Sequence, residues 1–188
     1  MSKNPHYFWA VPLPDKMKKI IHAEMLHVKH IFQFNRWVHM DDYHITLVFL
    51  GAVEEQKLQT VIDLVGEAIT EGQSFSLQIT GLNIFGNEQT PRIFWGAVNE
   101  EHALFQLQAI VQQQCLDAGF TLDTRPYHPH ITFARKWSSA ERFDQELLTK
   151  YNPFQAKPLS FHVEEIVLYK TNMEQIPKYE PVIRISIK

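Results

Sequence analysis

Two short stretches of the chain repeat a histidine and a threonine at the same spacing. "YHITLVFLG" holds the first motif, at residues 44–47, and "RPYHPHITFAR" holds the second, at residues 130–133. The second motif begins 86 residues after the first. The shared His-Ile-Thr sequence is too short to be a solenoid repeat. It is long enough to be half of a symmetric active site.

Both motifs stand in apolar runs that are typical of β-strands. Residues i and i+2 of a strand point to the same face, roughly 6.6 Å apart. His44 and Thr46 therefore project together, while Ile45 points the other way into a core. The same holds for His130 and Thr132. If the two strands face each other, two imidazoles and two hydroxyls line one cleft.

Such a set of side chains can carry out phosphoryl chemistry. Two histidines with pKa values near 6.5 can divide the work at neutral pH, one neutral as the base and one protonated as the acid. Two threonine hydroxyls can donate hydrogen bonds to the two nonbridging oxygens of a phosphate. This arrangement suits an in-line displacement at phosphorus, with water deprotonated on one side and the leaving oxygen protonated on the other. The chemistry requires no metal.

Other interpretations of these residues are possible. A single His-x-Thr pair in a strand usually has no catalytic role, but two copies at equivalent places are hard to obtain by accident. His128 and His130 could together bind zinc, yet no third ligand is signalled nearby and Thr132 is a poor one. Cys115 lies on an apolar helical stripe and is predicted to be core. No Gly-rich phosphate loop supports ATP chemistry. We therefore predict no metal and no cofactor.

The motifs belong to a longer series of strands and helices. "SSAE" at 138–141 fits a capping box and predicts a helix that starts there. Apolar stripes predict helices within 17–32, 58–69 and 104–118. The predicted strands are 7–11, 44–50, 75–79, 92–98, 130–134, 161–169 and 182–187.

The order of these elements repeats, with one motif in each half of the chain. Two similar lobes, each a sheet covered by helices, give the most economical architecture, and several of the strand pairs could be antiparallel. No Pro/Gly/Ser-rich linker divides them. We therefore expect residues 1–188 to form a single bilobal domain.

Composition limits the kind of protein further. The chain has 188 residues, of which 45% are apolar and 21% charged, as in ordinary globular proteins. Its net charge of −3 argues against broad polyanion binding, so a nucleic-acid contact should be local. The single cysteine excludes an intrachain disulfide. The first residues lack a signal-peptide pattern, and the longest apolar run is far below the ~20 residues that span a bilayer. We expect a soluble cytoplasmic protein with no membrane contact and no obligate protein partner.

The sequence resembles the 2H phosphoesterase superfamily, which is named for two His-x-Thr/Ser motifs. Within it, the resemblance is to the RNA 2′,3′-cyclic phosphodiesterases, also called 2′-5′ RNA ligase-like proteins. "YFWAVPLP", "HITLVFLG", "PRIFWGAV" and "HPHITFAR" stand in the family's order over nearly the whole chain. The resemblance implies an α/β (α+β) fold that is bilobal and pseudo-twofold, with two antiparallel sheets flanked by helices around a central cleft.

The resemblance also implies an activity and roles for the two histidines. It implies metal-independent hydrolysis of RNA 2′,3′-cyclic phosphate ends, or of small cyclic nucleotides, to a 2′-phosphomonoester. In the family, the histidine of the first motif is the proton donor and that of the second is the acceptor. The matching positions are His44 and His130. From the residues alone, only a pair is supported, without an order.

Further residues near the motifs are expected to bind substrate. Thr46 and Thr132 are expected to contact the phosphate, and Arg135 could reach it bidentately, although a surface ion pair is an equal alternative. The resemblance places Arg92 near the cleft mouth. Phe49, Phe94 and Trp95 could stack a base, but aromatic residues within strands are usually core.

Two other functions remain compatible with the sequence. A 2′-5′ RNA ligase would run the same in-line chemistry in reverse, although water favours hydrolysis. A non-catalytic RNA-end-binding module would use the histidines only as phosphate contacts.

Overall fold

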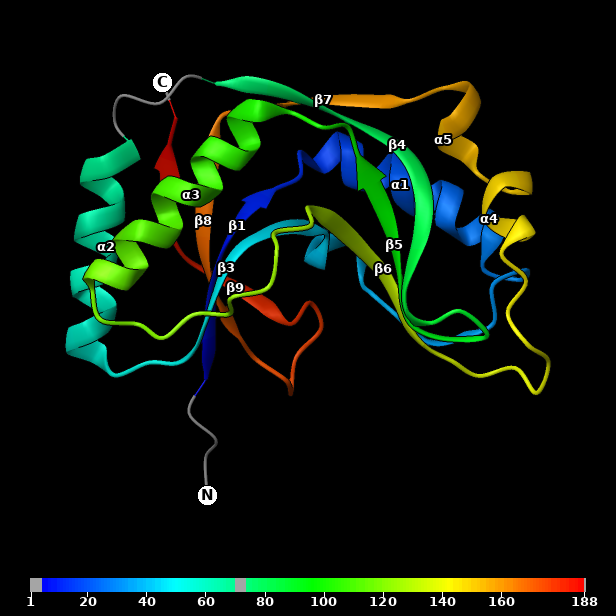
Figure 1. Cartoon of the computed structure of the whole chain (residues 1–188), viewed down its shortest axis with the longest axis horizontal. Helices are drawn as coiled ribbons and strands as arrows, with labels where there is room; N and C mark the ends of the chain where they lie inside the picture. Colours follow the sequence, from blue (N-terminus) through cyan, green and yellow to red (C-terminus); the bar gives the residue numbers. More distant parts are fainter. Residues whose placement is uncertain (1–4, 70–73, 188) are drawn as a thin grey trace.

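A computed structural model describes residues 5–69 and 74–187. It contains a sheet of nine strands with helices packed against it (Figure 1). In chain order the elements are β1 (His6–Pro12), α1 (Asp15–Val28), β2 (Phe34–Trp37), the 3₁₀ turn η1 (Met40–Asp42), β3 (His44–Ala52), α2 (Glu55–Ile69), β4 (Phe75–Asn87), β5 (Thr90–Val98), α3 (His102–Asp117), β6 (His130–Trp137), α4 (Glu146–Lys150), α5 (Pro153–Ala156), β7 (Leu159–Val163), β8 (Glu165–Thr171) and β9 (Tyr179–Ser186).

The sheet consists of two antiparallel halves that meet at the motif strands. The strand order is β7-β4-β5-β6-β3-β1-β8-β9, with β2 paired to β6 off this path. Each half contributes four strands of this path, and the two halves are joined by a single residue pair, Ile45 of β3 with Ile131 of β6. All strand pairs are antiparallel. The predicted fold class, an α/β fold of antiparallel strands with flanking helices, is confirmed, and the two expected sheets are joined into one.

The helices cover the sheet because each has one apolar face. α1 buries Met17, Ile21, Met25 and Val28, which recur at helical spacing. α3 likewise buries Leu104, Leu107, Val111 and Cys115, so Cys115 lies in the core as predicted. α2 and α3 pack together at one end of the molecule, and α4 and α5 lie at the other (Figure 1). None of the helices in the described ranges is long and apolar enough to cross a bilayer.

One predicted strand is two strands in different halves of the sheet. Residues 161–169 were expected to form one strand, but β7 pairs with β4 and β8 pairs with β1. The chain therefore crosses from one half to the other at Glu164, between two apolar runs that local pattern cannot separate. This crossing ties the two halves together.

The prediction that a helix begins at the capping box of residues 138–141 is wrong. The Ser138 hydroxyl donates to the Gln33 carbonyl at 2.8 Å, so it caps no helix. Phe143 is buried against Phe34 and Trp137. The tertiary contacts of this segment override its local signal, and the next helix begins only at Glu146.

Candidate active site

The two motifs occupy matching positions at the centre of the sheet. His44 begins β3 and His130 begins β6, and the first six residues of both strands share one alternation of burial. Ile45 and Ile131 are fully buried partners across the two strands. Continued in the same antiparallel register, Thr46 lies opposite His130, and His44 opposite Thr132. The four side chains thus lie on one face around a local twofold axis.

A β-bulge lies at the last residue of each motif. In β3, Thr46 pairs with Ala10 and Val48 with Trp9, so Leu47 is the extra residue. In β6, Thr132 pairs with Trp95 and Ala134 with Phe94, so Phe133 is the extra residue. A bulge shifts the alternation of side chains by one position.

The bulges bring two more side chains to the face that carries the histidines. Phe49 and Arg135, each five residues after its histidine, are exposed, whereas the two residues before each of them are buried. Regular alternation would have turned both away from the site. Arg135 lies close enough to both histidines to lower their pKa values, and it has no ion pair in the described part of the chain.

Each histidine ring is oriented by the backbone carbonyl two residues before it. His44 Nδ1 lies 2.7 Å from the Asp42 carbonyl oxygen, and His130 Nδ1 lies 2.7 Å from the His128 carbonyl oxygen. Because a carbonyl only accepts, Nδ1 carries the proton in both rings. Nε2 is therefore the atom that can gain or lose a proton toward a substrate. In His44 this atom lies 3.0 Å from the Thr46 hydroxyl, which donates to it when the ring is neutral.

Aromatic side chains hold both rings in place. His44 packs against Phe8, with ring centroids 4.9 Å apart, and meets Tyr179 edge-on at 5.1 Å. His130 meets Phe85 edge-on at 5.0 Å and Trp95 at 5.7 Å. These walls exclude water from one side of each imidazole.

Burial keeps both imidazoles neutral near pH 7. It lowers the pKa of His44 from 6.5 to about 4; the hydrogen bond to the Asp42 carbonyl opposes this, and the charges of His130, Arg135 and Lys18 add to it. Burial also lowers the pKa of His130, and Arg135 contributes in the same direction. An anion bound between the rings would raise both pKa values, since it favours the imidazolium form.

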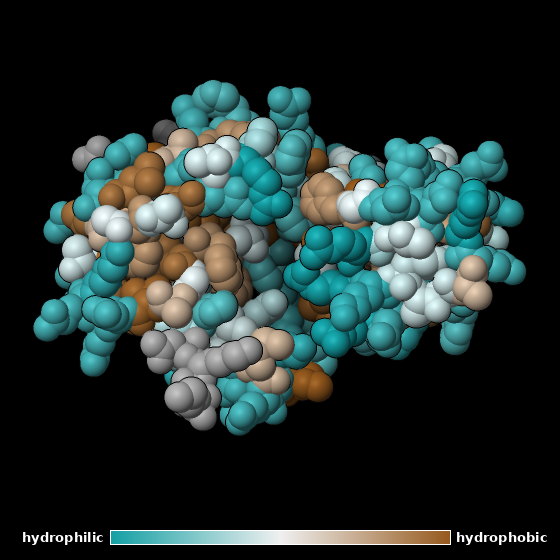
Figure 2. Space-filling view, turned by 60° about the horizontal axis from the view of Figure 1, so that its bottom comes forward, coloured by the Kyte–Doolittle hydropathy of each residue, from teal (hydrophilic) through white to brown (hydrophobic). Residues whose placement is uncertain are grey.

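A large cavity opens beside the second motif. Its volume is about 910 Å³, and it extends from Thr46 and His130 along β3 to Phe49 and across to α3 and the segment before β6. Arg92, Phe85 and Tyr127 contribute to its lining. The molecular face shown in Figure 2 is hollowed between its two halves, with apolar side chains gathered on one side of the hollow and polar ones on the other.

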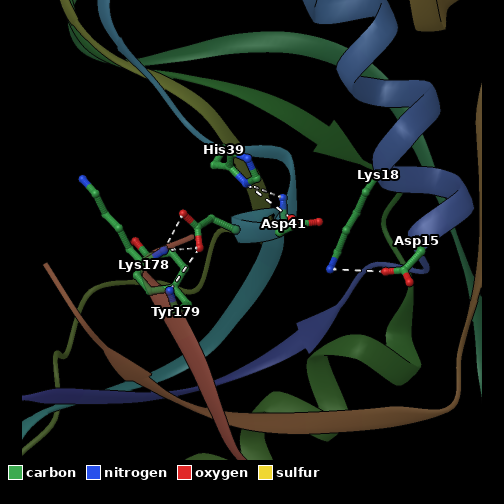
Figure 3. A network of polar contacts seen from close by, with 7 residues as sticks. Asp15, Lys18, His39, Asp41, Lys178 and Tyr179 are labelled. Atoms are coloured by element: carbon green, nitrogen blue, oxygen red, sulfur yellow. Dashed lines mark hydrogen bonds and ion pairs between the residues drawn. The ribbon is translucent and has the colours of Figure 1, made fainter. Parts of the chain in front are cut away.

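Asp42 connects the first motif to β9. Its carboxylate accepts hydrogen bonds from the Lys178 amide at 2.9 and 3.0 Å and from the Tyr179 amide at 3.1 Å (Figure 3). Asp42 is the only charged residue among those described that is buried, with 5% of its surface exposed. Its own carbonyl orients His44, so one residue fixes both the ring and the strand that covers it.

The structure brings most of the predicted site residues together. His44 contacts Thr46, and Thr46, His130 and Arg92 line the cavity. Thr132 lies in β6 beside Trp95. Of the aromatic residues considered from the sequence, Phe94 is fully buried core, whereas Phe49 is 54% exposed and lines the cavity. Asp42, Tyr179 and Phe8 were not predicted, and only the position of Asp42 before the motif hinted at a role.

No zinc site is formed by the histidines around the second motif. Within residues 5–69 and 74–187, no group of three histidine, cysteine or acidic side chains lies close enough to hold one ion. The hydrogen bond from His130 Nδ1 leaves only Nε2 for any other contact.

Known proteins share both sequence and fold with this chain. A family model described as the 2′-5′ RNA ligase superfamily matches residues 33–174. An RNA 2′,3′-cyclic phosphodiesterase of Geobacillus stearothermophilus is 44% identical over 180 residues, which are 96% of this chain and 56% of that protein. One of Bacillus subtilis (strain 168) is 33% identical over 183 residues, which are 97% of each chain. The crystal structure of Escherichia coli LigT complexed with 3′-AMP superimposes with a TM-score of 0.76 at 25% identity and covers 98% of this chain and 99% of its own.

These matches confirm the family expected from the two motifs. The chain belongs to the 2′-5′ RNA ligase superfamily. It spans just over half the length of the Geobacillus relative and nearly all of the Bacillus one.

Proposed function

We propose that the chain hydrolyses the 2′,3′-cyclic phosphodiester at the end of an RNA to a 2′-phosphomonoester. The observation that carries this proposal is the matched pair of histidines, each with Nδ1 held by a carbonyl and Nε2 turned to the site. The names of the Geobacillus and Bacillus relatives support this substrate class, and the complex of LigT with 3′-AMP supports binding of nucleotides.

The reaction needs one proton acceptor and one proton donor on opposite sides of phosphorus. His130 Nε2 takes a proton from water as the water oxygen bonds to phosphorus. The bond from phosphorus to O3′ breaks, and His44 Nε2 gives its proton to that oxygen. The two rings finish with exchanged protonation states and reset through solvent. The order of donor and acceptor follows the family resemblance.

The remaining side chains hold the phosphate. Once His44 is protonated, its Nε2–H no longer accepts from Thr46, whose hydroxyl then donates to a nonbridging oxygen. Thr132 does the same from β6. The Arg135 guanidinium neutralises the anion, and Arg92 at the cavity contacts the adjoining part of the substrate. These contacts strengthen as negative charge builds up in the transition state.

The substrate itself charges the acid. With a pKa of about 4, His44 is a poor proton donor at neutral pH until an anion is bound. A cyclic phosphodiester carries one negative charge, and its binding between the rings raises both pKa values. Protonation is thereby coupled to binding, and the site requires no metal in this mechanism. Because the site takes one motif from each half of the sheet, residues 1–188 act as a single bilobal domain.

A turnover assay on an RNA with a 2′,3′-cyclic phosphate end, in the presence of excess chelator, tests the proposal. We expect hydrolysis at the same rate as without chelator, and a product phosphate at the 2′ position by phosphorus NMR. Loss of activity that zinc or manganese restores would refute the mechanism. Joining of the ends would indicate the ligase instead, and binding without turnover would indicate the RNA-binding module.

A further inference from the structure

The surroundings of the two histidines differ although the motifs are related by symmetry. Phe8, Tyr169 and Tyr179 pack around the His44 ring, with centroids 4.9 to 6.0 Å from it. The His130 ring lines the cavity. The site is thus closed on the side of the first motif and open on the side of the second. A group attached to a phosphate at the histidines extends into the open side.

The volume of the cavity on the open side is larger than the cyclic phosphate alone requires. A volume of about 910 Å³ lies near the upper end for pockets that enclose small ligands, which run from about 300 to 1,000 Å³. A single nucleoside 2′,3′-cyclic phosphate, its base included, is at the small end of such ligands and needs only the part next to Thr46 and His130. The remainder lies between the end of β3 and α3.

The lining of this remainder suits a nucleotide. Phe49 is 54% exposed. Its ring meets the His6 ring in an edge-on contact, with centroids 5.6 Å apart, so a face of the Phe49 ring is available for stacking. On α3, the Gln108 and Gln112 amides lie 3.3 Å apart and present both donors and acceptors. The buried hydroxyl of Tyr127 has no hydrogen-bond partner among the described residues. Arg92 adds a cation for a backbone phosphate.

We propose that this part of the cavity is a subsite for the nucleotide on the 5′ side of the one that carries the cyclic phosphate. The base stacks on Phe49 and hydrogen-bonds to Gln112, and the intervening phosphodiester lies toward Arg92. The inference rests on the proposed function and specifies its substrate, which is an oligonucleotide end in preference to a cyclic mononucleotide.

Kinetics on two substrates test the subsite. Adenosine 2′,3′-cyclic phosphate fills only the reacting part of the site, whereas the dinucleotide ApA with the same end reaches the subsite. We expect the dinucleotide to be hydrolysed with a kcat/KM at least tenfold higher. Phe49→Ala should lower kcat/KM for the dinucleotide at least fivefold more than for the mononucleotide, because stacking on an aromatic ring is lost. Gln112→Ala should act in the same direction.

Matched variants on α3 outside the cavity serve as controls. Gln113 bonds to Asp117 at 2.8 Å, and Leu116 is 45% exposed. Gln113→Ala and Leu116→Ala should leave the preference for the dinucleotide unchanged. Equal kcat/KM values for the two substrates would overturn the subsite while leaving the hydrolase intact.

Failure of the hydrolase is distinguishable from failure of the subsite. If neither substrate is turned over, the proposed function is wrong, and titration calorimetry with the same two compounds then decides the subsite. Binding of the dinucleotide at least tenfold tighter than the mononucleotide, and sensitive to Phe49→Ala, would support it. Equal affinities would overturn it.

Discussion

Asp42 holds His44 with its backbone and holds the strand that covers His44 with its side chain. The carbonyl accepts from His44 Nδ1 at 2.7 Å, and the carboxylate accepts from the amides of Lys178 and Tyr179. Tyr179 in turn meets the His44 ring edge-on. At the second motif, His128 supplies the same carbonyl, but its side chain is exposed. The backbone contacts of the two histidines are therefore symmetric, but a side chain, the Asp42 carboxylate, adds support only on the His44 side.

Asp42→Ala should lower kcat about tenfold or more with a smaller change in KM. The substitution leaves two partly buried amides without this acceptor, at a cost of up to about 1–3 kcal/mol each, and releases Tyr179 from the His44 ring. Steady-state kinetics at a temperature where circular dichroism shows the variant folded provide the measurement. The kcat of Asp42→Asn, which keeps one acceptor oxygen, should lie between the values for the wild type and for Asp42→Ala.

The neighbouring carboxylate provides the control for Asp42. Asp41 lies in the same 3₁₀ turn and is exposed. Asp41→Ala should keep the wild-type kcat. A folded Asp42→Ala variant with unchanged kcat would show that the carboxylate has only a structural role.

Acid should destabilise the protein through His44. The folded-state pKa is about 4 and the ordinary value is 6.5, so the unfolded chain takes up this proton first as the pH falls. The stabilising contribution is present above pH 6.5 and is lost between about 6.5 and 4, on the order of 3 kcal/mol. Urea unfolding at several pH values should show that His44→Gln loses less stability over this range than the wild type. Parallel losses in both proteins would argue against a buried neutral His44.

Gly96→Ala should destabilise the fold by about 1–3 kcal/mol, through overpacking. A Cβ at Gly96 would lie 2.5 and 2.7 Å from two ring atoms of Phe133, the extra residue of the bulge in β6. At Gly81, in the adjacent strand, the nearest atom would be 3.6 Å away, so Gly81→Ala is the matched control. The denaturant midpoints of the Gly96→Ala and Gly81→Ala variants provide the measurement. Equal midpoints would mean that Phe133 can move aside at little cost.

The pH dependence of the rate should differ between kcat/KM and kcat. The protein without substrate sets the limbs of kcat/KM, where burial lowers the pKa values of both histidines. Bound phosphate raises both values, so both limbs of the bell-shaped kcat profile should lie at higher pH. Steady-state rates from pH 4 to 10 provide the comparison. Superimposable profiles would show that the anion does not lie between the imidazoles.

The sequence predicted the motif strands because their pattern is local. Alternation of apolar and polar residues around His44 and His130 indicates a strand and the shared face of each His–Thr pair. The stripes on α1 and α3 were found in the same way, and Cys115 was placed in the core. These features depend on neighbours in the sequence.

Features that depend on distant contacts were missed. The bulges at Leu47 and Phe133 arise from pairing with β1 and β5, so alternation alone could not bring Phe49 and Arg135 to the site. The break between β7 and β8 has no turn residue to mark it. The role of Asp42 requires amides 136 and 137 residues away, which no local pattern reveals.

Loss of either threonine should cost less than loss of either histidine. Thr46→Val and Thr132→Val each remove one neutral hydrogen bond to the phosphate and leave the proton transfers in place. We expect a reduction of about tenfold in kcat for each. His22→Ala and His27→Ala, both on α1, should retain the wild-type rate.

The most direct test of the account is the rate of hydrolysis of an RNA 2′,3′-cyclic phosphate end by His44→Ala and by His130→Ala. Each folded variant should lose about a hundredfold or more in kcat, the usual scale for a positioned acid or base. The double variant should lose little more than either single one, because the two rings act as a unit. A folded variant of either histidine that keeps near-full activity would contradict the two-histidine mechanism.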